Sequence, residues 1–358
     1  MQRFTNISLF SGALGLDLGL EKAGFTTVLA VDVSRVACDT IRANRLHPRV
    51  LHADIRSLTA QDILREAGMT RGEPDLVSGG PACQAFTTIG KRRFLKDPRG
   101  RLVKDFVRIV AGVRPKFFLM ENVRGILSAP SFPKEKKDSR KGSRTLFESL
   151  LRDFERLGYR CSWALLNSSD FGVPQTRKRV FVVGNRAGLP FRFPKPTHSP
   201  FGKRKWKTLR DALEGLHDRA NLCGKYTPRK ARYLRLIPAG GGWRSLPPCL
   251  QRAAMGKAFY AHGGRTAFFR RLSFDKPCPT LLCDPMTKAC SFCHPTELRP
   301  LSVAEYARVQ QFPDTWRFCG SVSQRYALIA NAVPVGLARA VGVSIHNALL
   351  GAEYAAAA

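Results

Sequence analysis

Short apolar runs that alternate with segments of helical spacing dominate the N-terminal part of the chain. Five such runs occupy residues 7–10, 27–31, 50–54, 75–79 and 117–120. Strands that alternate with helices at this spacing form parallel sheets, because each crossover helix packs against a face of the sheet. The sequence therefore predicts a doubly wound, Rossmann-like α/β fold, in which ligands bind outside the carboxyl ends of the strands.

The first run breaks into a glycine turn, residues 10–15 (FSGALG), before a helical pattern begins. A strand, a glycine turn and a helix leave backbone amides exposed, and such amides can receive a cofactor. Asp32 ends the second run about 20 residues later, where an acidic side chain commonly binds a ribose. From these residues alone, Asp32 either binds a ribose or caps the helix that follows it.

Cys83 lies within residues 78–88 (SGGPACQAFTT), just after the fourth run. A thiolate is the strongest nucleophile that a side chain offers near neutral pH, and nearby positive charge raises the thiolate fraction. Lys91, Arg92 and Arg93 supply such charge, in a basic loop that either closes over a polyanion or is simply solvated. Because most cysteines are small buried hydrophobes, Cys83 is a candidate nucleophile only in the company of other residues.

Arg177 and Arg179 precede the apolar run 180–184 at alternate positions. Alternate residues of a strand point to the same face of a sheet. The two guanidinium groups are therefore expected to reach the crevice together, unless both are charges at the edge of the sheet.

The charge of the chain indicates a polyanionic partner. Lysine and arginine number 59 against 27 acidic residues, which gives a net charge of +32. Nucleic acid fits this excess best, because no stretch approaches the roughly 20 apolar residues of a membrane-spanning helix. The polar start runs directly into the first strand, so no signal peptide is expected and the protein is predicted to be cytoplasmic.

The ten cysteines are scattered along the chain and do not form the pattern of a small disulfide scaffold. In a reducing compartment they are expected to stay free thiols. Cys283, Cys290, Cys293 and His294 resemble zinc ligands, but a single CxxC lacks a second matched pair. No metal is therefore expected.

The composition changes near residue 195, where prolines interrupt the apolar runs. We expect residues 1–195 to form a cofactor-binding domain, 196–321 a smaller irregular domain, and 322–358 a segment that returns to the first domain. Arginine and glycine are frequent in the second part, and arginines on loops can read guanine edges in a DNA groove.

Several motifs occur in one order along nearly the whole chain. They are FSGALG at 10–15, GGPACQAF at 79–86, ENV at 121–123, QTRKR at 175–179, RPLSVAEYARVQQFPD at 299–314 and NAVP at 331–334. In this order and in these strand contexts the chain resembles the DNA (cytosine-5)-methyltransferase family, in its bacterial or phage modification form. The resemblance implies a methyltransferase sheet that uses S-adenosylmethionine, with a smaller irregular target-recognition domain at 196–321.

The resemblance also implies the catalytic residues. Cys83 corresponds to the nucleophile that adds to carbon 6 of cytosine, because carbon 5 alone is too weak a nucleophile to take a methyl group. Glu121 corresponds to the acid that faces ring nitrogen 3, with Asn122 orienting it. Arg179 corresponds to the group that binds the carbonyl oxygen of the base, and Arg177 supports it. Further substrate-binding residues implied in this way are Pro81, Gln84, Lys91 and Arg92.

For the cofactor, the resemblance implies contacts from the first turn, the strand ends and the C-terminal part of the chain. These residues are Phe10, Gly12, Gly15, Asp32, Asp54, Leu102 and Asn331. The target cytosine must leave the double helix to reach such a pocket, so base flipping of double-stranded DNA is expected. Arg308 is expected to stabilise the recognition domain.

The resemblance further implies a monomeric, nucleoid-associated modification enzyme, with a cognate restriction endonuclease as a partner in the same system. The chain departs from the family pattern at Leu14, Ala82 and Ala330, where the family commonly has glycine, proline and glycine. These departures remove no chemical group. Two alternatives stay open: methylation of cytosine in RNA, and a catalytically weak DNA-binding protein.

Overall fold

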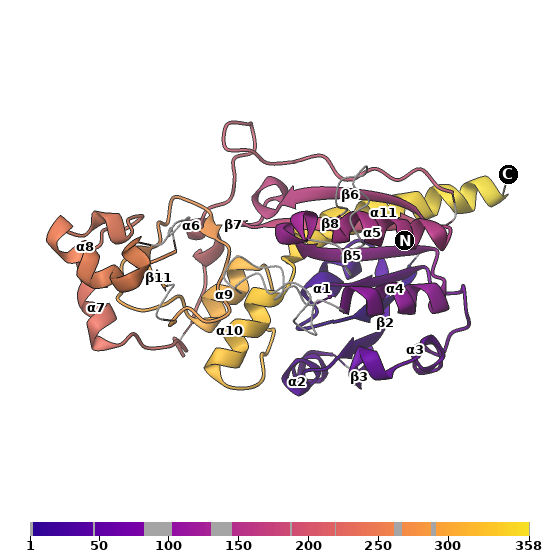
Figure 1. The fold of residues 1–358 in the computed structure, drawn as a ribbon, viewed down its shortest axis with the longest axis horizontal. Coiled ribbons are helices and arrows are strands. Elements are labelled where there is room, and N and C mark those ends of the chain that lie inside the picture. Colours follow the sequence, from indigo (N-terminus) through magenta and orange to yellow (C-terminus); the bar gives the residue numbers. More distant parts are fainter. Residues whose placement is uncertain are drawn as a thin grey trace, which may run out of the picture. The chain divides into compact units, whose positions relative to one another are not determined.

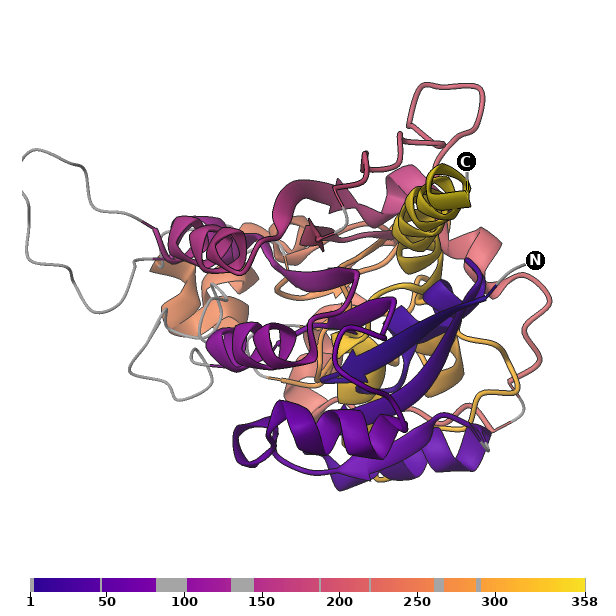
Figure 2. The ribbon, with the colours of Figure 1, turned by 90° about the vertical axis from the view of Figure 1, so that its right-hand side faces the viewer.

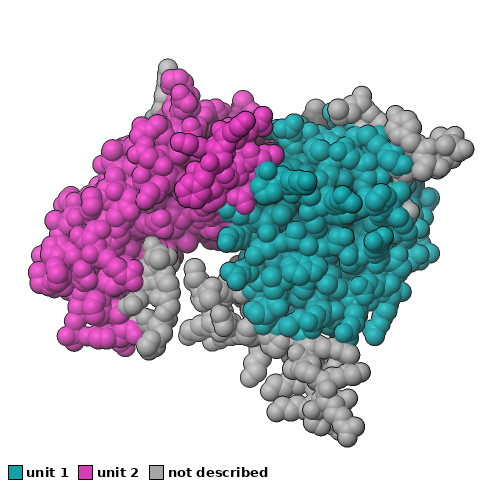
Figure 3. Space-filling view, turned by 90° about the horizontal axis from the view of Figure 1, so that it is seen from above, with its two compact units in different colours: residues 1–167, 178–196, 335–358 teal, residues 168–177, 197–334 magenta. Residues whose placement is uncertain are grey.

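The computed structural model divides into two compact units (Figure 3). Unit 1 is Met1–Asn167, Lys178–Pro196 and Val335–Ala358, and unit 2 is Ser168–Arg177 and Thr197–Pro334. The structure describes residues 3–45, 47–81, 102–129, 145–186, 188–218, 220–260, 267–287 and 291–357, and of 352–357 only the backbone. The sequence analysis placed its boundaries after residues 195 and 321, and the roles assigned to the parts remain predictions.

Unit 1 is built on a seven-stranded sheet (Figure 1). Its strands, in spatial order, are β3 (Arg49–His52), β2 (Phe25–Asp32), β1 (Phe4–Leu9), β4 (Leu76–Gly79), β5 (Phe117–Val123), β8 (Lys178–Asn185) and β6 (Arg160–Asn167). The first five are mutually parallel, and β8 runs antiparallel to both β5 and β6. The predicted doubly wound α/β fold is confirmed.

The strand order reverses direction at β1, which lies between β2 and β4. β1 and β4 are paired, and their last residues, Leu9 and Gly79, are in register. A Cβ atom on Gly79 would lie 2.5 Å from the carbonyl oxygen of Leu9, so a side chain here would push the two strand ends apart. The segments that leave β1 and β4 therefore begin side by side, at the point where ligands bind in open α/β sheets.

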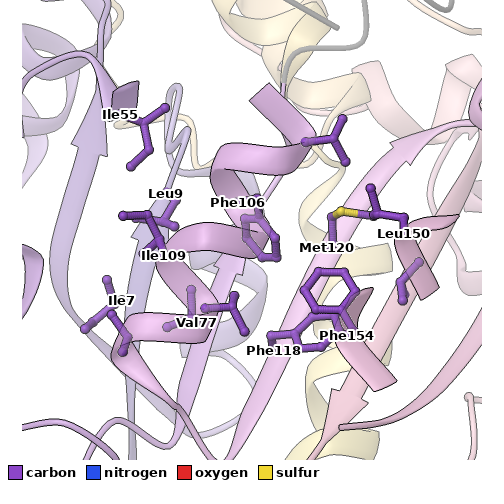
Figure 4. Packing of buried hydrophobic residues seen from close by; sticks show 14 of the residues in the cluster. Ile7, Leu9, Ile55, Val77, Phe106, Ile109, Phe118, Met120, Leu150 and Phe154 are labelled. Atoms are coloured by element: carbon purple, nitrogen blue, oxygen red, sulfur yellow. The ribbon is translucent and has the colours of Figure 1, made fainter. Parts of the chain in front are cut away.

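One face of the sheet is covered by helices that carry an apolar stripe. These helices are α3 (Ala60–Ala67), α4 (Leu102–Val113) and α5 (Leu146–Arg156). Threonine capping boxes at Thr59 and Thr145 start α3 and α5. The main core lies beneath them, where the ring of Phe118 stacks on that of Phe154 with centroids 4.0 Å apart (Figure 4).

The opposite side carries α11 (Val335–Ala357), which packs against α1 (Gly15–Glu21) (Figure 2). A Cβ atom on Gly19 would lie 2.3 Å from the Cβ of Ala338, so the glycine permits the two helices to approach closely. The C-terminal helix is thus an integral part of unit 1. The remaining helical elements of unit 1 are α2 (Arg35–Asn44), η1 (Ile55–Ser57) and η4 (Arg124–Ser128).

The sequence Val322–Gly351 is long and apolar enough to cross a membrane by length and composition, which corrects the expectation that no stretch approaches this limit. A core helix of a soluble protein can have the same length and composition. The stretch comprises α10 (Val322–Asn331) and most of α11, with Pro334 between them. More than half of its most apolar window is buried inside the protein, as expected for core helices.

Unit 2 contains short strands and, in its described residues, more helix than the sequence predicted. Its strands and helices are β7 (Gln175–Thr176), β9 (Arg270–Arg271), β10 (Cys278–Pro279), β11 (Phe292–Cys293), α6 (Leu209–Leu213), α7 (Pro228–Arg235), α8 (Pro248–Met255), α9 (Val303–Val309) and α10, with η5 (Ser168–Phe171), η6 (Trp243–Ser245) and η7 (Gly256–Tyr260). α7 begins with the N-cap Thr227 followed by Pro228 at the first helical position. This pattern predicts a helix start, and it was not recognised in the sequence.

A buried carboxyl group lies between α1 and the sheet. Asp17 is fully buried and accepts hydrogen bonds from Asn6 Nδ2 (3.0 Å), Ser8 Oγ (2.9 Å) and Thr27 Oγ1 (3.2 Å). Burial raises the pKa of Asp17 from 3.8 to about 7, although the hydrogen bond from Ser8 acts in the opposite direction. The folded protein therefore binds a proton here that the unfolded chain releases near pH 4.

We expect the Asp17→Asn variant to lose this pH dependence. The Asn side chain keeps an acceptor for Asn6 and Thr27, and its amide can donate to the hydroxyl of Ser8. Because the folded pKa is raised, the free energy of unfolding of the wild type falls as pH rises from about 4 to about 7, by about 4 kcal/mol at most. Urea titrations across this range should show the variant gaining stability relative to the wild type, and a constant difference would contradict the assignment.

Candidate active site

Glu121 and Arg179 form a buried ion pair at the carboxyl end of β5. The Nε atom of Arg179 lies 2.9 Å from Oε1 of Glu121, and the two side chains are 13% and 11% exposed. Glu121 pairs with Phe181 in the antiparallel ladder, and Arg179 pairs with Val123, so the two side chains are diagonal neighbours on one face. The sequence placed Glu121 after the strand, whereas β5 continues through it to Val123.

The segment that leaves β4 lies against this ion pair. A Cβ atom on Gly80 would lie 3.0 Å from Oε2 of Glu121, so the backbone of Gly80 is adjacent to the carboxylate. Pro81, the next residue, is buried, and its carbonyl oxygen accepts a hydrogen bond from Nδ2 of Asn122 at 3.2 Å. The acid and the start of the Cys83 motif are thus held together within unit 1.

Asn122 contacts the backbone of this segment and not the acid it was expected to orient. Its Oδ1 accepts from the amide of Val123 at 2.9 Å, while its Nδ2 donates to Pro81. The reason is the pleat of the strand: Glu121 and Asn122 are consecutive in β5, so their side chains point to opposite faces. The geometry makes Asn122 a support for the Gly80–Pro81 turn.

Four of the predicted site residues lie outside the described residues. They are Cys83, Gln84, Lys91 and Arg92. In the sequence, Cys83 follows Pro81 by two positions.

The glycine turn after β1 winds back on itself through residues with positive φ. Phe10, Gly12 and Leu14 have φ angles of 55°, 53° and 63°. A Cβ atom on Gly12 would meet nothing within 4 Å, so the space beside this glycine is open. Leu14, which replaces the glycine common in the family, is fully buried and adopts the left-handed conformation that glycine favours. Gly15 begins α1 directly after it.

Asp32 ties this turn to the end of β2. Its Oδ2 accepts from the amide of Gly12 and its Oδ1 from the amide of Ser34, both at 2.8 Å. The N-cap of α2 is Ser34, whose side chain accepts from the amide of Ala37. Asp32 therefore does not cap this helix, which was the alternative role that the sequence allowed. Burial raises the pKa of Asp32, while the two backbone hydrogen bonds act to lower it.

Val33 is a residue that the sequence analysis missed. It follows Asp32 directly, and its apolar side chain is 65% exposed. The only signal in the sequence was an apolar residue at a strand end where polar turn residues are usual. An exposed apolar side chain beside a carboxylate and an open glycine turn suits a ligand with both a sugar and a flat apolar base.

The other predicted cofactor residues of unit 1 differ in their surroundings. Asp54 caps η1 and forms an ion pair with Arg56, whose hydrogen bond lowers the pKa of Asp54. A ligand amino group at Asp54 would therefore share its carboxylate with Arg56. Leu102 begins α4, is half-buried and packs against the core.

Arg177 and Arg179 do not belong to one strand. β8 begins at Lys178, so the alternation that predicted a shared direction does not apply to Arg177. Arg177 is buried in unit 2, and its carbonyl oxygen accepts from the amide and the hydroxyl of Ser168. The structure thus gives Arg177 a place in the packing of unit 2, whereas Arg179 contacts Glu121 in unit 1.

Two further predicted residues belong to unit 2. Asn331 ends α10, is exposed, and its Oδ1 accepts from Sγ of Cys283 at 3.1 Å. Arg308 donates to the carbonyl oxygens of Ala212, Glu214 and Gly215 at the C-terminus of α6, and it forms an ion pair with Asp314. These contacts are those expected of a residue that stabilises this unit.

Of the zinc-like residues, Cys293 and His294 are buried and engaged by their own segment. Sγ of Cys293 contacts the carbonyl oxygen of Glu297 at 3.3 Å, and Nδ1 of His294 accepts from the amide of Glu297 at 3.1 Å. Cys290 lies outside the described residues. Within the described ranges, no three His, Cys, Asp or Glu side chains are grouped as metal ligands.

The chain matches known proteins over nearly its whole length. A family model described as C-5 cytosine-specific DNA methylase matches residues 4–347. The chain is 39% identical over 348 residues to the Type II methyltransferase M.PspPI of Psychrobacter sp. (strain TA137), over 96% of this chain and 79% of that protein. It is 38% identical over 342 residues to the Type II methyltransferase M.Sau96I of Staphylococcus aureus, over 94% of this chain and 74% of that protein.

Solved structures agree with these matches. A candidate DNA modification methyltransferase encoded within an E. coli prophage superposes with a TM-score of 0.68 and 25% identity, over 97% of this chain and 99% of that one. The S. pombe Dnmt2 methyltransferase shares the fold, with a TM-score of 0.62 and 18% identity, over 98% and 99%. The resemblance of the motifs is therefore confirmed, and the chain belongs to the C-5 cytosine-specific DNA methylase family.

Proposed function

We propose that this protein transfers a methyl group from S-adenosylmethionine to carbon 5 of a flipped-out cytosine in double-stranded DNA, through a covalent adduct with Cys83. The observation that carries the proposal is the buried Glu121–Arg179 ion pair next to the Gly80–Pro81 turn that leads to Cys83. Relatives named Type II methyltransferases support a modification role. We further propose that the protein acts as a cytoplasmic monomer, with a cognate restriction endonuclease in the same system.

The chemistry begins with the thiolate of Cys83. Its sulfur forms a bond to carbon 6 of cytosine, and the electron pair of the carbon 5–carbon 6 double bond becomes available at carbon 5. Glu121 faces ring nitrogen 3 and, in its protonated form, donates a proton there as the ring gains charge. Arg179 stabilises the charge that develops on the carbonyl oxygen. After methylation, a water molecule removes the proton on carbon 5 and the carbon–sulfur bond breaks, which releases the thiolate of Cys83. The proton on ring nitrogen 3 returns to Glu121, and the ring is restored.

The residues of the first turn fit S-adenosylmethionine. When bound, this cofactor supplies an electrophilic methyl group. The carboxylate of Asp32 is fixed by two backbone amides, and each of its oxygens keeps a second lone pair that can accept from a ribose hydroxyl group. Val33 offers an apolar surface for the adenine. The open space at Gly12 admits the ligand next to the backbone.

Residues 196–321 are proposed to recognise the DNA target. The sequence from residue 219 to 274 contains no aspartate or glutamate, while lysines and arginines recur throughout it. Exposed arginines are held over aromatic rings here, with Arg244 at 4.6 Å from the ring centroid of Trp243 and Arg252 at 5.5 Å from that of Tyr260. The positive charge of such a surface is complementary to the negative phosphate backbone of DNA.

A methylation assay with labelled S-adenosylmethionine tests the proposal, with unmethylated plasmid DNA and transfer RNA as parallel substrates. We expect label on DNA only, and bisulfite sequencing of the plasmid should show carbon-5 methylation within one sequence context. Label on RNA alone would favour the alternative substrate. Absence of label on both, from protein that binds S-adenosylmethionine, would contradict the proposal.

Removing either member of the ion pair should slow the addition of Cys83. We expect Glu121→Gln and Arg179→Ala to reduce the methylation rate by about 10²–10⁴-fold, because each loses a group that acts on the charged ring. Covalent trapping on DNA that contains 5-fluorocytosine measures the addition directly. Arg45→Ala is the control, since it removes another ion pair of unit 1, from Arg45 to Glu21 at 2.9 Å. A Glu121→Gln enzyme with wild-type trapping would contradict the role of the acid.

Asn122→Asp tests the support of the Gly80–Pro81 turn. The variant keeps an acceptor for the amide of Val123 but loses the donor to Pro81. We expect trapping to slow by about 10- to 100-fold, as for a misplaced reacting group, with unchanged cofactor affinity. Asn44→Asp, which removes an amide-to-carbonyl hydrogen bond within α2, should behave as the wild type. Equal rates for the two variants would show that the contact to Pro81 is not used.

Cofactor binding should depend on pH through Asp32. Its carboxylate is the binding form, and its pKa is raised, so affinity should be lost as pH falls through a value above the ordinary 3.8. Calorimetric titration with S-adenosylmethionine should show this loss in the wild type, and weak, pH-independent binding in Asp32→Asn. Asp39→Asn, on the exposed side of α2, should match the wild type. Wild-type affinity in Asp32→Asn would contradict the assignment.

A further inference from the structure

The peptide group that joins Val33 to Ser34 lies just beyond the end of β2 and is held at both of its polar atoms. Its N–H, from Ser34, donates to Oδ1 of Asp32 at 2.8 Å. Its carbonyl oxygen, from Val33, lies 3.0 Å from Nε2 of His52. Because a carbonyl oxygen only accepts, Nε2 of His52 carries the hydrogen and donates it. Asp32 and His52 therefore fix the plane of one peptide group between them.

His52 reaches this peptide group from the neighbouring strand. It is the last residue of β3, the strand at one end of the sheet (Figure 1), and it pairs in register with Asp32. The amide of Ala53 donates to the carbonyl oxygen of Asp32 at 3.1 Å. The imidazole of His52 donates to the next carbonyl oxygen, where β2 has already ended. A side chain thus continues the pairing of the two strands one residue beyond β2.

The carboxylate of Asp32 depends on the same peptide group. Its Oδ2 accepts from the amide of Gly12 and its Oδ1 from the amide of Ser34, so it cannot turn without losing a charge-assisted hydrogen bond. If the Val33–Ser34 peptide group rotated, the amide of Ser34 would leave Oδ1. The orientation of the carboxylate therefore depends on the hydrogen bond that His52 makes on the other side of this peptide group.

The two side chains also interact through their charges. Burial raises the pKa of Asp32, whereas the hydrogen bonds from Ser34 and Gly12 and a positive charge on His52 act to lower it. The imidazole is exposed and the carboxylate is half-buried. His52 can thus act on Asp32 through its charge and through the peptide group, and an experiment has to separate these two effects.

We propose that His52 is a positioning residue for Asp32: by holding the carbonyl oxygen of Val33, it keeps the amide of Ser34 on Oδ1 and so fixes the carboxylate for the hydroxyl groups of a ribose. This inference rests on the proposed role of Asp32 in binding S-adenosylmethionine. It adds that recognition of the ribose is set in part by a histidine of the next strand. All residues concerned belong to unit 1.

The test compares two ligands in equilibrium binding without DNA. 5′-Methylthioadenosine carries both ribose hydroxyl groups, and its 2′,3′-dideoxy analogue lacks them. The dissociation constant of the analogue divided by that of 5′-methylthioadenosine is the ribose ratio, which measures recognition of the hydroxyl groups apart from other contacts. We expect His52→Ala to lower the ribose ratio by about two- to tenfold, the range for one hydrogen bond. Equal weakening of both ligands would indicate a general loss of packing and would overturn the inference.

His52→Gln is the conservative variant. The side-chain amide of glutamine can donate to the carbonyl oxygen of Val33, but it carries no charge. We expect His52→Gln to keep the ribose ratio of the wild type, because the peptide group is still held. A ribose ratio as low as that of His52→Ala would show that the hydrogen bond is not what His52 contributes. The position is exposed, so both variants are expected to fold.

Arg42→Ala is the matched control. Arg42 is also an exposed side chain that donates to a backbone carbonyl oxygen at this end of the sheet, that of Val50 in β3 at 3.2 Å. Its removal deletes a positive charge and a hydrogen bond at a different peptide group, so the ribose ratio should not change. In methylation assays, His52→Ala should raise KM for S-adenosylmethionine and leave kcat at saturating cofactor unchanged, whereas Arg42→Ala should change neither.

The outcomes separate this inference from the function on which it rests. If the wild type does not bind S-adenosylmethionine, the proposed function fails. If the wild type binds it but does not distinguish the two nucleosides, Asp32 does not bind the ribose and the inference is overturned. If the wild type distinguishes them and His52→Ala does so equally well, the inference is overturned and the function stands. A lower ribose ratio in His52→Ala that is restored in His52→Gln supports the inference.

Discussion

The close approach of β1 and β4 is the constraint on which the rest of unit 1 depends. Leu9 and Gly79 end these strands in register, and the glycine admits the neighbouring carbonyl oxygen where a side chain would collide with it. Two segments with different chemistry therefore start from adjacent points. One is the turn that Asp32 fastens to β2, and the other is the Gly80–Pro81 turn beside Glu121. A methyl donor and its acceptor need such adjacency, because the reacting atoms must approach to about 3–3.5 Å before transfer.

Much of this was predictable from the sequence, because strands with short apolar runs and acids at their ends leave a local signal. The doubly wound sheet and the family were predicted correctly. The strand boundaries differ from those expected: β5 runs through Glu121 and Asn122, so the pleat separates their side chains, and β8 begins at Lys178, after Arg177. A shift of one residue along a strand moves a side chain to the other face of the sheet.

The contacts that escaped prediction join residues that are distant in the sequence. Gln175 and Gln310 are 135 positions apart, and no periodicity or spacing connects them. Cys283 and Asn331 are 48 positions apart, in segments that the sequence assigned to different parts of the chain. Local patterns report the burial of a face, whereas pairs of this kind are set by tertiary packing. Only the three-dimensional arrangement shows that such residues are in contact.

The packing of α11 on α1 has a consequence for the newly made chain. α1 ends at Glu21 and α11 begins at Val335, so α1 leaves the ribosome long before the helix that packs on it. Until Ala338 and Gly342 arrive, Gly19 and Leu20 of α1 lack their packing partners. Such exposed surface attracts chaperones and promotes aggregation during synthesis. The packing of α1 is therefore completed only after almost all of the described chain has been made.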